Sequence, residues 1–453
     1  MNSKLLERFD IRINPAQALV IGFAVVILVG SILLSLPVAT VSGEPTPYVD
    51  SLFTATSAVC VTGLVVVDTG TYWSLFGEVV IAILIQIGGL GFMTFGVLFA
   101  LLLGRKIGLK SRLLLQTQFN EFTLQGVVRL ATRILMITIG IELLATAILA
   151  IRLVPRYGWG TGVWVSFFHA LSAFNNAGFD LFGRLETPFS SLTTFYGDPL
   201  VMGVIALLFI VGGIGFTVLI DLVRKHSFRK FTLHTKLVLV TTGLLIFTGT
   251  VGIALMEWSN PATLGAMNVG QALGNAFFQA VTPRTAGFNS LNIGMMTMGS
   301  QFLIIMLMFV GASPGSTGGG IKTTNLAALF AGAKAIVKGS KGAVLFNRKL
   351  PEDQINRATL VLMIAVTLVV TSTFVLTLTE TADFLVIFFE VVSAFGTVGL
   401  SMGLTTELST AGRLIISLTM FVGRLGPATV AFALARRKHC NIIGFPEEKI
   451  ILG

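Results

Sequence analysis

The octapeptide SAFNNAGF occupies residues 172–179, and three similar octapeptides occur at 57–64 (SAVCVTGL), 281–288 (VTPRTAGF) and 393–400 (SAFGTVGL). In each octapeptide a glycine precedes the final Leu or Phe. These glycines lie 109 to 115 residues apart and are Gly63, Gly178, Gly287 and Gly399. A repeat of this length is too long for a solenoid, and its spacing is too regular for chance. The sequence therefore predicts one structural unit that is repeated four times.

Long apolar runs flank the octapeptides. Of the 453 residues, 54% are hydrophobic and 11% are charged, whereas an ordinary soluble domain is about 25% charged. Eight runs are long enough to cross a bilayer; they lie near residues 17–37, 72–103, 134–154, 200–223, 237–256, 301–333, 358–379 and 411–435. The predicted fold class is an all-α integral membrane protein, with a helix, a re-entrant segment and a second helix in each unit.

A glycine cluster follows each octapeptide, within the second helix of the unit. The clusters are GGLGF (88–92), GGIGF (212–216), GASPGSTGGG (311–320) and GRLGP (423–427). Because two landmarks recur in the same order, four repeat units are predicted, at residues 14–113, 130–232, 233–345 and 354–440.

The basic residues indicate how the predicted helices are oriented. Segments 1–13, 104–133, 224–236, 334–357 and 436–449 together hold 24 of the 31 Lys and Arg residues. Such residues are enriched in cytoplasmic loops, so both termini are predicted to be cytoplasmic. The net charge of +10 then reflects membrane topology, and it does not indicate binding of nucleic acid.

The octapeptides are predicted to lie at membrane depth, although they are too short to cross it. Non-helical backbone is tolerated there only where it is buried in protein or lines a water-filled cavity, so the four are predicted to share one pore. Glycine reaches positive φ without a Cβ penalty, which lets successive carbonyl oxygens face an ion. The candidate ion-coordinating residues are Cys60, Val61, Thr62, Gly63, Asn175, Asn176, Ala177, Gly178, Arg284, Thr285, Ala286, Gly287, Gly396, Thr397, Val398 and Gly399.

The third glycine cluster is predicted to break the sixth apolar run, because one proline and five glycines among ten residues do not sustain a helix. The predicted loop consists of Gly311, Ala312, Ser313, Pro314, Gly315, Ser316, Thr317, Gly318, Gly319 and Gly320. A kinked helix is the alternative interpretation. Lys322 follows the loop and is expected to snorkel. Although the cluster approaches a phosphate-binding motif, Ile321 separates the lysine from the last glycine and no strand precedes it, so nucleotide binding is not predicted here.

Three further charged residues lie where a charge is costly and often functional. Arg424 is predicted to face the cavity below the octapeptides, with snorkelling to the cytoplasmic edge as the alternative. Glu142 is expected to pair with a neighbouring helix. Arg284 is expected to point behind its octapeptide, toward Glu257 or Glu390.

The stretches NNAGF, TAGF and TVGL, together with the fourfold pattern, resemble the Trk/Ktr/HKT potassium transporter superfamily, most closely its KtrB-type membrane subunits. The resemblance covers essentially the whole chain. It implies eight transmembrane helices and four re-entrant pore loops, in four pseudo-symmetric repeats around one pore. Each repeat has an outer helix, a pore helix and an inner helix (M1-P-M2). It implies potassium uptake through a filter made of the 16 candidate residues, gated by the loop 311–320 and Arg424. Glycine at the filter position of the first repeat, here Gly63, is associated in this family with potassium, and serine with sodium.

The resemblance also implies a set of partners. It predicts a homodimer in the lipid of the cell membrane, with a cytosolic KtrA-type ring of nucleotide-binding regulatory subunits on the basic inner loops. Any nucleotide would then act through the partner ring. K⁺ is the expected transported ion and Na⁺ the expected activator, with no covalent cofactor and no nucleic acid.

Other classes of protein fit the sequence less well. A sodium-selective or non-selective monovalent cation transporter of the same architecture is one alternative. An alternating-access transporter would require inverted repeats, whereas these units recur in one orientation. An enzyme is not predicted, because the apolar runs offer no paired carboxylates and no HExxH motif. Two cysteines and four scattered histidines indicate neither a disulfide framework nor a metal site.

Overall fold

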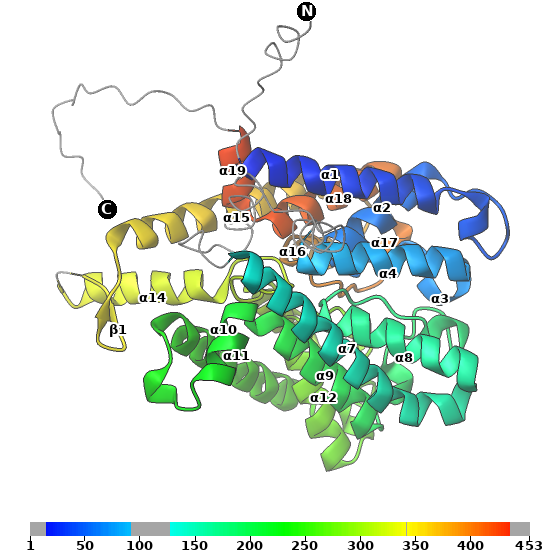
Figure 1. Ribbon diagram of the computed structural model, residues 1–453, viewed down its shortest axis with the longest axis horizontal. Helices are drawn as coiled ribbons and strands as arrows, with labels where there is room; N and C mark the ends of the chain where they lie inside the picture. The colour runs from blue at the N-terminus through cyan, green and yellow to red at the C-terminus, as the bar shows by residue number, and fades with distance from the viewer. Residues whose placement is uncertain (1–14, 92–126, 341, 435–453) are drawn as a thin grey trace, which may run out of the picture.

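The computed structural model describes residues 15–91, 127–340 and 342–434. Within these ranges almost every element is a helix, and the single sheet is a two-stranded hairpin (Figure 1). The chain is therefore mostly helical, as predicted. The predicted basic segments 1–13 and 436–449, most of 104–133, and the second half of the run 72–103 lie outside the described residues.

The helices form four groups, each with a long helix, a shorter helix that ends at an octapeptide, and a further helix that ends at a glycine cluster. The first group has α1 (Pro15–Leu34), η2 (Pro37–Ala39), α2 (Tyr48–Val59), α3 (Thr69–Tyr72) and α4 (Leu75–Leu90). The second has α7 (Val127–Tyr157), α8 (Trp159–Phe174), η3 (Phe182–Arg184), η4 (Thr193–Phe195), α9 (Pro199–Ile214), α10 (Phe216–Arg224) and η5 (Phe228–Lys230). The third has α11 (Leu233–Glu257), η6 (Leu264–Ala266), α12 (Val269–Val281), η7 (Ile293–Met295), α13 (Met298–Phe309), α14 (Thr323–Val337), β1 (Val344–Leu345) and β2 (Arg348–Lys349). The fourth has α15 (Glu352–Thr379), α16 (Phe384–Gly396), α17 (Leu404–Glu407), α18 (Thr410–Leu425) and α19 (Pro427–Leu434).

Polar side chains mark where several helices begin. The hydroxyl of Ser74 accepts from an amide in the first turn of α4, and Thr232 and Ser409 do the same for α11 and α18. Asp198 caps α9, whose first residue is Pro199. Such side chains satisfy amides that have no partner inside the helix, and proline at the first position sacrifices no hydrogen bond.

The four groups close into a ring in which each contacts the next. Helix α4 packs on α8 of the second group, and α9 packs on α12 of the third. Helix α13 then packs on α16 of the fourth group, and α18 packs on α2 of the first. In Figure 1 the blue first group and the orange fourth group share one side of the molecule, and the green second and third groups form the other.

The long helices have the dimensions of membrane spans. Among the described residues, α1, α7, α11 and α15 are long and apolar enough to cross a bilayer, and the pair α9–α10 is a fifth candidate, bent by 97°. The runs 200–223 and 411–435 are each interrupted, at Gly215 and at Gly426. These two glycines have φ of 101° and 84°. Because a residue at positive φ leaves the right-handed helical region, the helix cannot continue through either glycine.

The first glycine of three clusters joins two helices of one group. A Cβ atom on Gly88 would lie 2.0 Å from the carbonyl oxygen of Val59, and one on Gly212 would lie 2.0 Å from that of Phe174. At Gly423 the corresponding distance to a carbonyl oxygen of α16 is 2.1 Å. Small residues let helices approach this closely in a membrane, so these glycines hold the short helices in place.

Candidate functional site

The octapeptides end in one shared backbone conformation over residues 60–63, 175–178, 284–287 and 396–399, here called the glycine segments. The residue two positions before each glycine has positive φ; these residues are Val61 (49°), Asn176 (59°), Thr285 (68°) and Thr397 (50°). The glycines have φ of 90°, 71°, 77° and 91° in chain order, and the residue between has no positive φ. A left-handed non-glycine residue costs about 1–3 kcal/mol and persists only where its surroundings impose it. Four such residues at aligned positions indicate that the surrounding structure imposes this conformation on all four segments.

The four glycines approach one another through backbone atoms. A Cβ atom added to any of them would overlap with the next segment in the ring. The nearest atoms are Ala177 O at 2.4 Å from the Cβ on Gly63, Gly287 Cα at 2.8 Å on Gly178, Val398 O at 2.7 Å on Gly287, and Thr62 O at 2.2 Å on Gly399. All 16 predicted coordinating residues are buried. The structure thus brings together all four predicted segments, in chain order around one centre.

Hydroxyl groups support the first and fourth segments from behind. The Ser57 hydroxyl accepts a hydrogen bond from the Gly63 amide at 3.0 Å. The Ser393 hydroxyl accepts the equivalent bond from the Gly399 amide at 3.1 Å. Both bonds hold the glycine at its positive φ from the side of the short helix.

In the second and third segments the hydroxyl bonds in the other direction. Ser172 donates to the carbonyl oxygen of Phe179 at 2.7 Å, and Thr282 donates to that of Phe288. These four hydroxyl residues were not among the predicted site residues. Their signal was present, because three octapeptides begin with serine and the other has threonine in second place.

The side chain of Arg284 is buried, and it forms no ion pair with another described residue. Both carboxylates that were expected to face it are occupied by other donors: Glu257 accepts from the amide and hydroxyl of Thr297, and Glu390 accepts from the hydroxyls of Ser401 and Thr405. Among the described residues, Nε and Nη2 of Arg284 have no hydrogen-bond partner. The expected pairing is therefore wrong, because loop hydroxyls and amides already satisfy both carboxylates.

Residues 311–320 form the predicted loop. Helix α13 ends at Phe309 and α14 begins at Thr323. The ends of the loop meet, since Val310 and Ile321 form a bridge and the Ala312 amide donates to the Gly319 carbonyl at 3.3 Å. The alternative of a kinked helix is therefore excluded.

This loop lies directly against the glycine segments. The Thr317 hydroxyl donates to Oδ1 of Asn176 at 2.9 Å. The Gly319 amide donates to the hydroxyl of Thr397 at 3.0 Å. Two left-handed residues, in the second and fourth segments, are thus hydrogen-bonded to the loop.

The loop also touches the third segment, at Gly318. A Cβ atom there would lie 2.0 Å from the hydroxyl oxygen of Thr285. The first segment has the apolar Val61 at this position. The loop therefore contacts the polar left-handed residue of three segments.

Two basic side chains hold the loop from below. Arg424 donates to the carbonyl oxygens of Thr317 and Gly88, so it joins the loop to α4. Nζ of Lys322 donates to the Gly318 carbonyl at 2.7 Å. Snorkelling was the alternative for Arg424 and the expectation for Lys322. In the structure both side chains instead donate to carbonyl oxygens of the loop.

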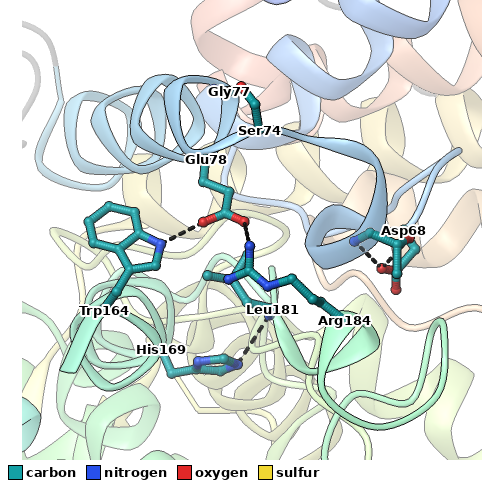
Figure 2. Close-up of polar contacts among 9 residues, drawn as sticks. Asp68, Ser74, Gly77, Glu78, Trp164, His169, Leu181 and Arg184 are labelled. Carbon is teal, nitrogen blue, oxygen red and sulfur yellow. Dashed lines mark hydrogen bonds and ion pairs between the residues drawn. The ribbon is translucent and has the colours of Figure 1, made fainter. Parts of the chain in front are cut away.

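A second polar cluster joins the first and second groups at the ends of α4 and α8 (Figure 2). Glu78 in the first turn of α4 is fully buried, and it accepts from Trp164 Nε1 at 2.5 Å and from Arg184 Nη1 at 2.9 Å. Nearby, Nε2 of His169 accepts from the Leu181 amide at 3.4 Å. These bonds fix the loop that follows the second glycine segment.

Side-chain metal ligands do not gather in the described residues. Within them, no group of three or more His, Cys, Asp or Glu could hold a metal ion. Cys60 is buried and free, and Cys440 lies outside the described residues.

Comparison with known proteins identifies the family. Residues 13–440 match the family model described as TrkH, cation transport protein. The chain is 48% identical over 443 residues to Ktr system potassium uptake protein B of Bacillus subtilis, covering 98% of each. It is 40% identical over 454 residues to potassium/sodium uptake protein NtpJ of Enterococcus hirae, covering 99% of each.

A solved structure has the same fold. The crystal structure of the potassium transporter TrkH from Vibrio parahaemolyticus matches with a TM-score of 0.69, covering 91% of this chain and 84% of that chain at 18% identity. These similarities place the protein among transporters rather than enzymes. The chain belongs to the TrkH family of cation transport proteins.

Proposed function

We propose that this protein takes up potassium through a filter made of the four glycine segments. The observation that carries the proposal is their common backbone, left-handed two residues before a left-handed glycine in all four. Alternating conformations of this kind let successive carbonyl groups face the same side of the chain. Rings of such carbonyls replace the hydration shell of K⁺ in potassium-selective pores. The relatives named as potassium uptake proteins support the choice of ion.

The membrane arrangement proposed with this function has eight transmembrane helices and four re-entrant pore loops. Four M1-P-M2 repeats, at residues 14–113, 130–232, 233–345 and 354–440, surround the pore in the cell membrane, with both termini in the cytoplasm. The inside-negative membrane potential drives uptake, because each positive charge that enters gains about 2.3 kcal/mol per 100 mV. Accumulation of K⁺ then needs no chemical reaction in this chain.

The gate in this proposal is the loop 311–320 with Arg424. The loop lies against three segments and is held by Arg424 and Lys322, so it would obstruct an ion that leaves the filter toward the cytoplasm. The Arg424 charge adds an electrostatic barrier to a cation at the same level. Movement of the loop would open the path.

Regulation is proposed to come from other chains. The similarity to a protein named as part of a Ktr system supports a partner component. In this proposal the partners are a second copy of the chain and a cytosolic ring of KtrA-type nucleotide-binding subunits. Nucleotides would act through that ring, and Na⁺ would act as an activator. The basic residues of the inner segments supply the charge for docking.

A second candidate is uptake of both potassium and sodium. It is favoured by the 40% identity to the Enterococcus hirae protein, whose name includes both ions. Gly63 favours the first candidate, since serine at this position is associated with sodium in the superfamily.

Tracer uptake into proteoliposomes tests the function. Purified protein takes up ⁸⁶Rb⁺ under an imposed inside-negative potential, with K⁺, Na⁺ or choline as competitors. Competition by K⁺ much stronger than by Na⁺ supports a potassium path. Equal competition by Na⁺ favours the second candidate, and a lack of potential-dependent uptake, with the regulatory ring added, contradicts both.

A further inference from the structure

An acidic residue lies in the long helix α7, inside a stretch that is otherwise suited to lipid. Glu142 falls within the apolar span of that helix, and only 4% of its surface is exposed. Counting back from the glycine of each segment, the other long helices have Ile27, Val251 and Met363 at this position. A carboxyl group in a membrane helix is costly, and it indicates a functional role by default. Of the four long helices, only the one in the second repeat has a carboxyl group at this position.

The carboxyl group of Glu142 connects two helices to the second glycine segment. Its Oε2 accepts from Nε2 of Gln86 on α4 at 3.1 Å, and its Oε1 accepts from Nδ2 of Asn175 at 2.9 Å. Nδ2 of Asn175 also lies 2.7 Å from Oε1 of Gln86 and 2.9 Å from the carbonyl oxygen of Leu171. No ion pair to Glu142 exists among the described residues. Its described polar partners are therefore two neutral amides.

Asn175 is held from three helices at once. Its two amide hydrogens face three acceptors, contributed by α4, α7 and α8. The side chain is fully buried, and it ends α8 with φ of −78° and ψ of 0°. A half-turn of this buried amide would place its oxygen against three acceptors and leave both of its donors unpaired, so the side chain is held in one orientation.

The next residue is the left-handed Asn176, which faces the other way. Its amide donates to Thr285 Oγ1 at 3.3 Å, and its Oδ1 accepts from Thr317 of the loop at 2.9 Å. The second segment is thus fixed behind by the Glu142 cluster and in front by its neighbours. Strained backbone persists only where the surroundings impose it from several sides.

We propose that Glu142 is a positioning residue that sets the preference of the filter for K⁺ over Na⁺. It acts through Asn175, by keeping the carbonyl oxygens of the second segment at the distance that suits the larger ion. Without this anchor the segment can move, and its carbonyl oxygens can approach the smaller Na⁺. This inference rests on the proposed potassium filter, and it assigns to a residue outside the filter a part of its selectivity.

Three substitutions at Glu142 test the proposal in the full-length protein. E142L removes both hydrogen-bond acceptors, and E142D withdraws them by one methylene. E142Q retains an acceptor for Asn175, and its amide group can pair with Gln86 after that side chain rotates. Thr146→Val is the matched control, since Thr146 lies one turn along α7 and its hydroxyl bonds only to the Glu142 backbone carbonyl.

The ratio of K⁺ to Na⁺ competition in the tracer assay is the readout, measured on protein that elutes from a size-exclusion column as the wild type does, and the melting temperature of each variant is measured beside it. We expect this ratio to fall about tenfold in E142L and about threefold in E142D, and to stay within about twofold in E142Q and T146V, as loss or retention of a buried hydrogen bond requires. A merely structural role would change the melting temperature and leave the ratio alone.

Two outcomes overturn the inference. A wild-type ratio in both E142L and E142D would show that the second segment does not depend on Glu142. A ratio in E142Q as low as in E142L would show that the charge matters and the hydrogen bond does not. If E142L does not fold, E142D alone decides. Uptake by the wild type is measured first. If the wild type shows no K⁺-selective uptake, the proposed function itself fails, and this outcome is distinct from any effect of the variants.

Discussion

The four glycine segments and the four glycine clusters that follow them are related in opposite ways. In the segments the side chains differ while the backbone is the same. The left-handed position is occupied by valine, asparagine or threonine, at Val61, Asn176, Thr285 and Thr397, yet φ at these residues spans only 49° to 68°. Backbone symmetry is conserved around the ring although the side chains are not.

The clusters differ in backbone. In three of them a helix ends at one glycine with positive φ, at Gly91, Gly215 and Gly426. The third forms a ten-residue loop that contacts three segments. The third cluster therefore differs in backbone structure from the other three.

This difference follows from the two tasks that we propose. Carbonyl coordination of an ion on a central axis needs equivalent backbone from every side, and it tolerates any side chain that permits the conformation. Obstruction of the same axis needs a single element, because four loops cannot occupy it together. If the loop is the gate and the segments are the filter, changes in the loop should alter the flux of K⁺, and changes in the segments should alter the selection of K⁺ over Na⁺.

Deletion of residues 312–317 should have the largest effect. It removes the Thr317 bond to the second segment and the acceptor of Arg424, so the flux of K⁺ should rise roughly a hundredfold if two or three bonds of about 1 kcal/mol hold the gate shut. Tracer uptake per folded protein measures this. Unchanged flux in a deletion variant with the wild-type melting temperature would remove the gate assignment.

Arg424→Gln should open the same gate less completely. The substitution removes charged hydrogen bonds to the loop and to α4, and at about 2 kcal/mol this predicts roughly a thirtyfold rise in flux. Arg413→Gln is the matched control, since Arg413 lies on the same helix and pairs with Asp50 instead of the loop. An equal effect of both substitutions would show that positive charge on α18, and not contact with the loop, controls flux.

Gly63→Ser should act on the filter and leave the gate intact. The new Cβ would lie 2.4 Å from the Ala177 carbonyl oxygen at a φ of 90°, so the first segment must shift. We expect K⁺ over Na⁺ selection to fall about tenfold, as strain of about 1–3 kcal/mol allows. Gly43→Ser is the control, because Gly43 also has positive φ but no atom within 4 Å of an added Cβ. An unaltered competition ratio would exclude Gly63 from the filter.

Thr317→Val should have the smallest effect. It retains the shape of the side chain and removes the hydroxyl bond to Asn176, worth about 1 kcal/mol, so flux should rise about fivefold. Thr377→Val on the exposed side of α15 is the control, since that hydroxyl bonds only to its own helix. A fall in flux would mean that Thr317 assists conduction and does not restrain it.

The sequence predicted the segments and the loop well, because both depend on local chemistry. Glycine at a constant interval and a run with proline and five glycines have few compatible conformations. The helical breaks at Gly215 and Gly426 were harder to foresee. A single glycine in an apolar run is compatible with a continuous helix. At Gly215 the break lies against the loop, where an added Cβ would be 2.7 Å from the Pro314 carbonyl oxygen.

The partners of two charged residues were predicted wrongly, whereas Glu142 pairs with a neighbouring helix and Arg424 bonds to the loop, as expected. Lys322 bonds to the loop although snorkelling was expected, and Arg284 pairs with neither expected carboxylate. A long side chain can reach many groups, and the choice depends on which acceptors other residues have already occupied. Which acceptors are occupied depends on the folded structure, and the spacing of residues along the sequence does not reveal it.

The sequence by itself determined the helical membrane class, the fourfold plan and the identity of the segments, because hydropathy and the conformational freedom of glycine act within a few residues. The tertiary structure alone decided the order in which the segments meet, the contacts of Arg424 with the loop and with α4, and the Glu142 cluster. Each of these contacts joins residues from different repeats or helices. Their geometry arises only when the ring of four groups has closed.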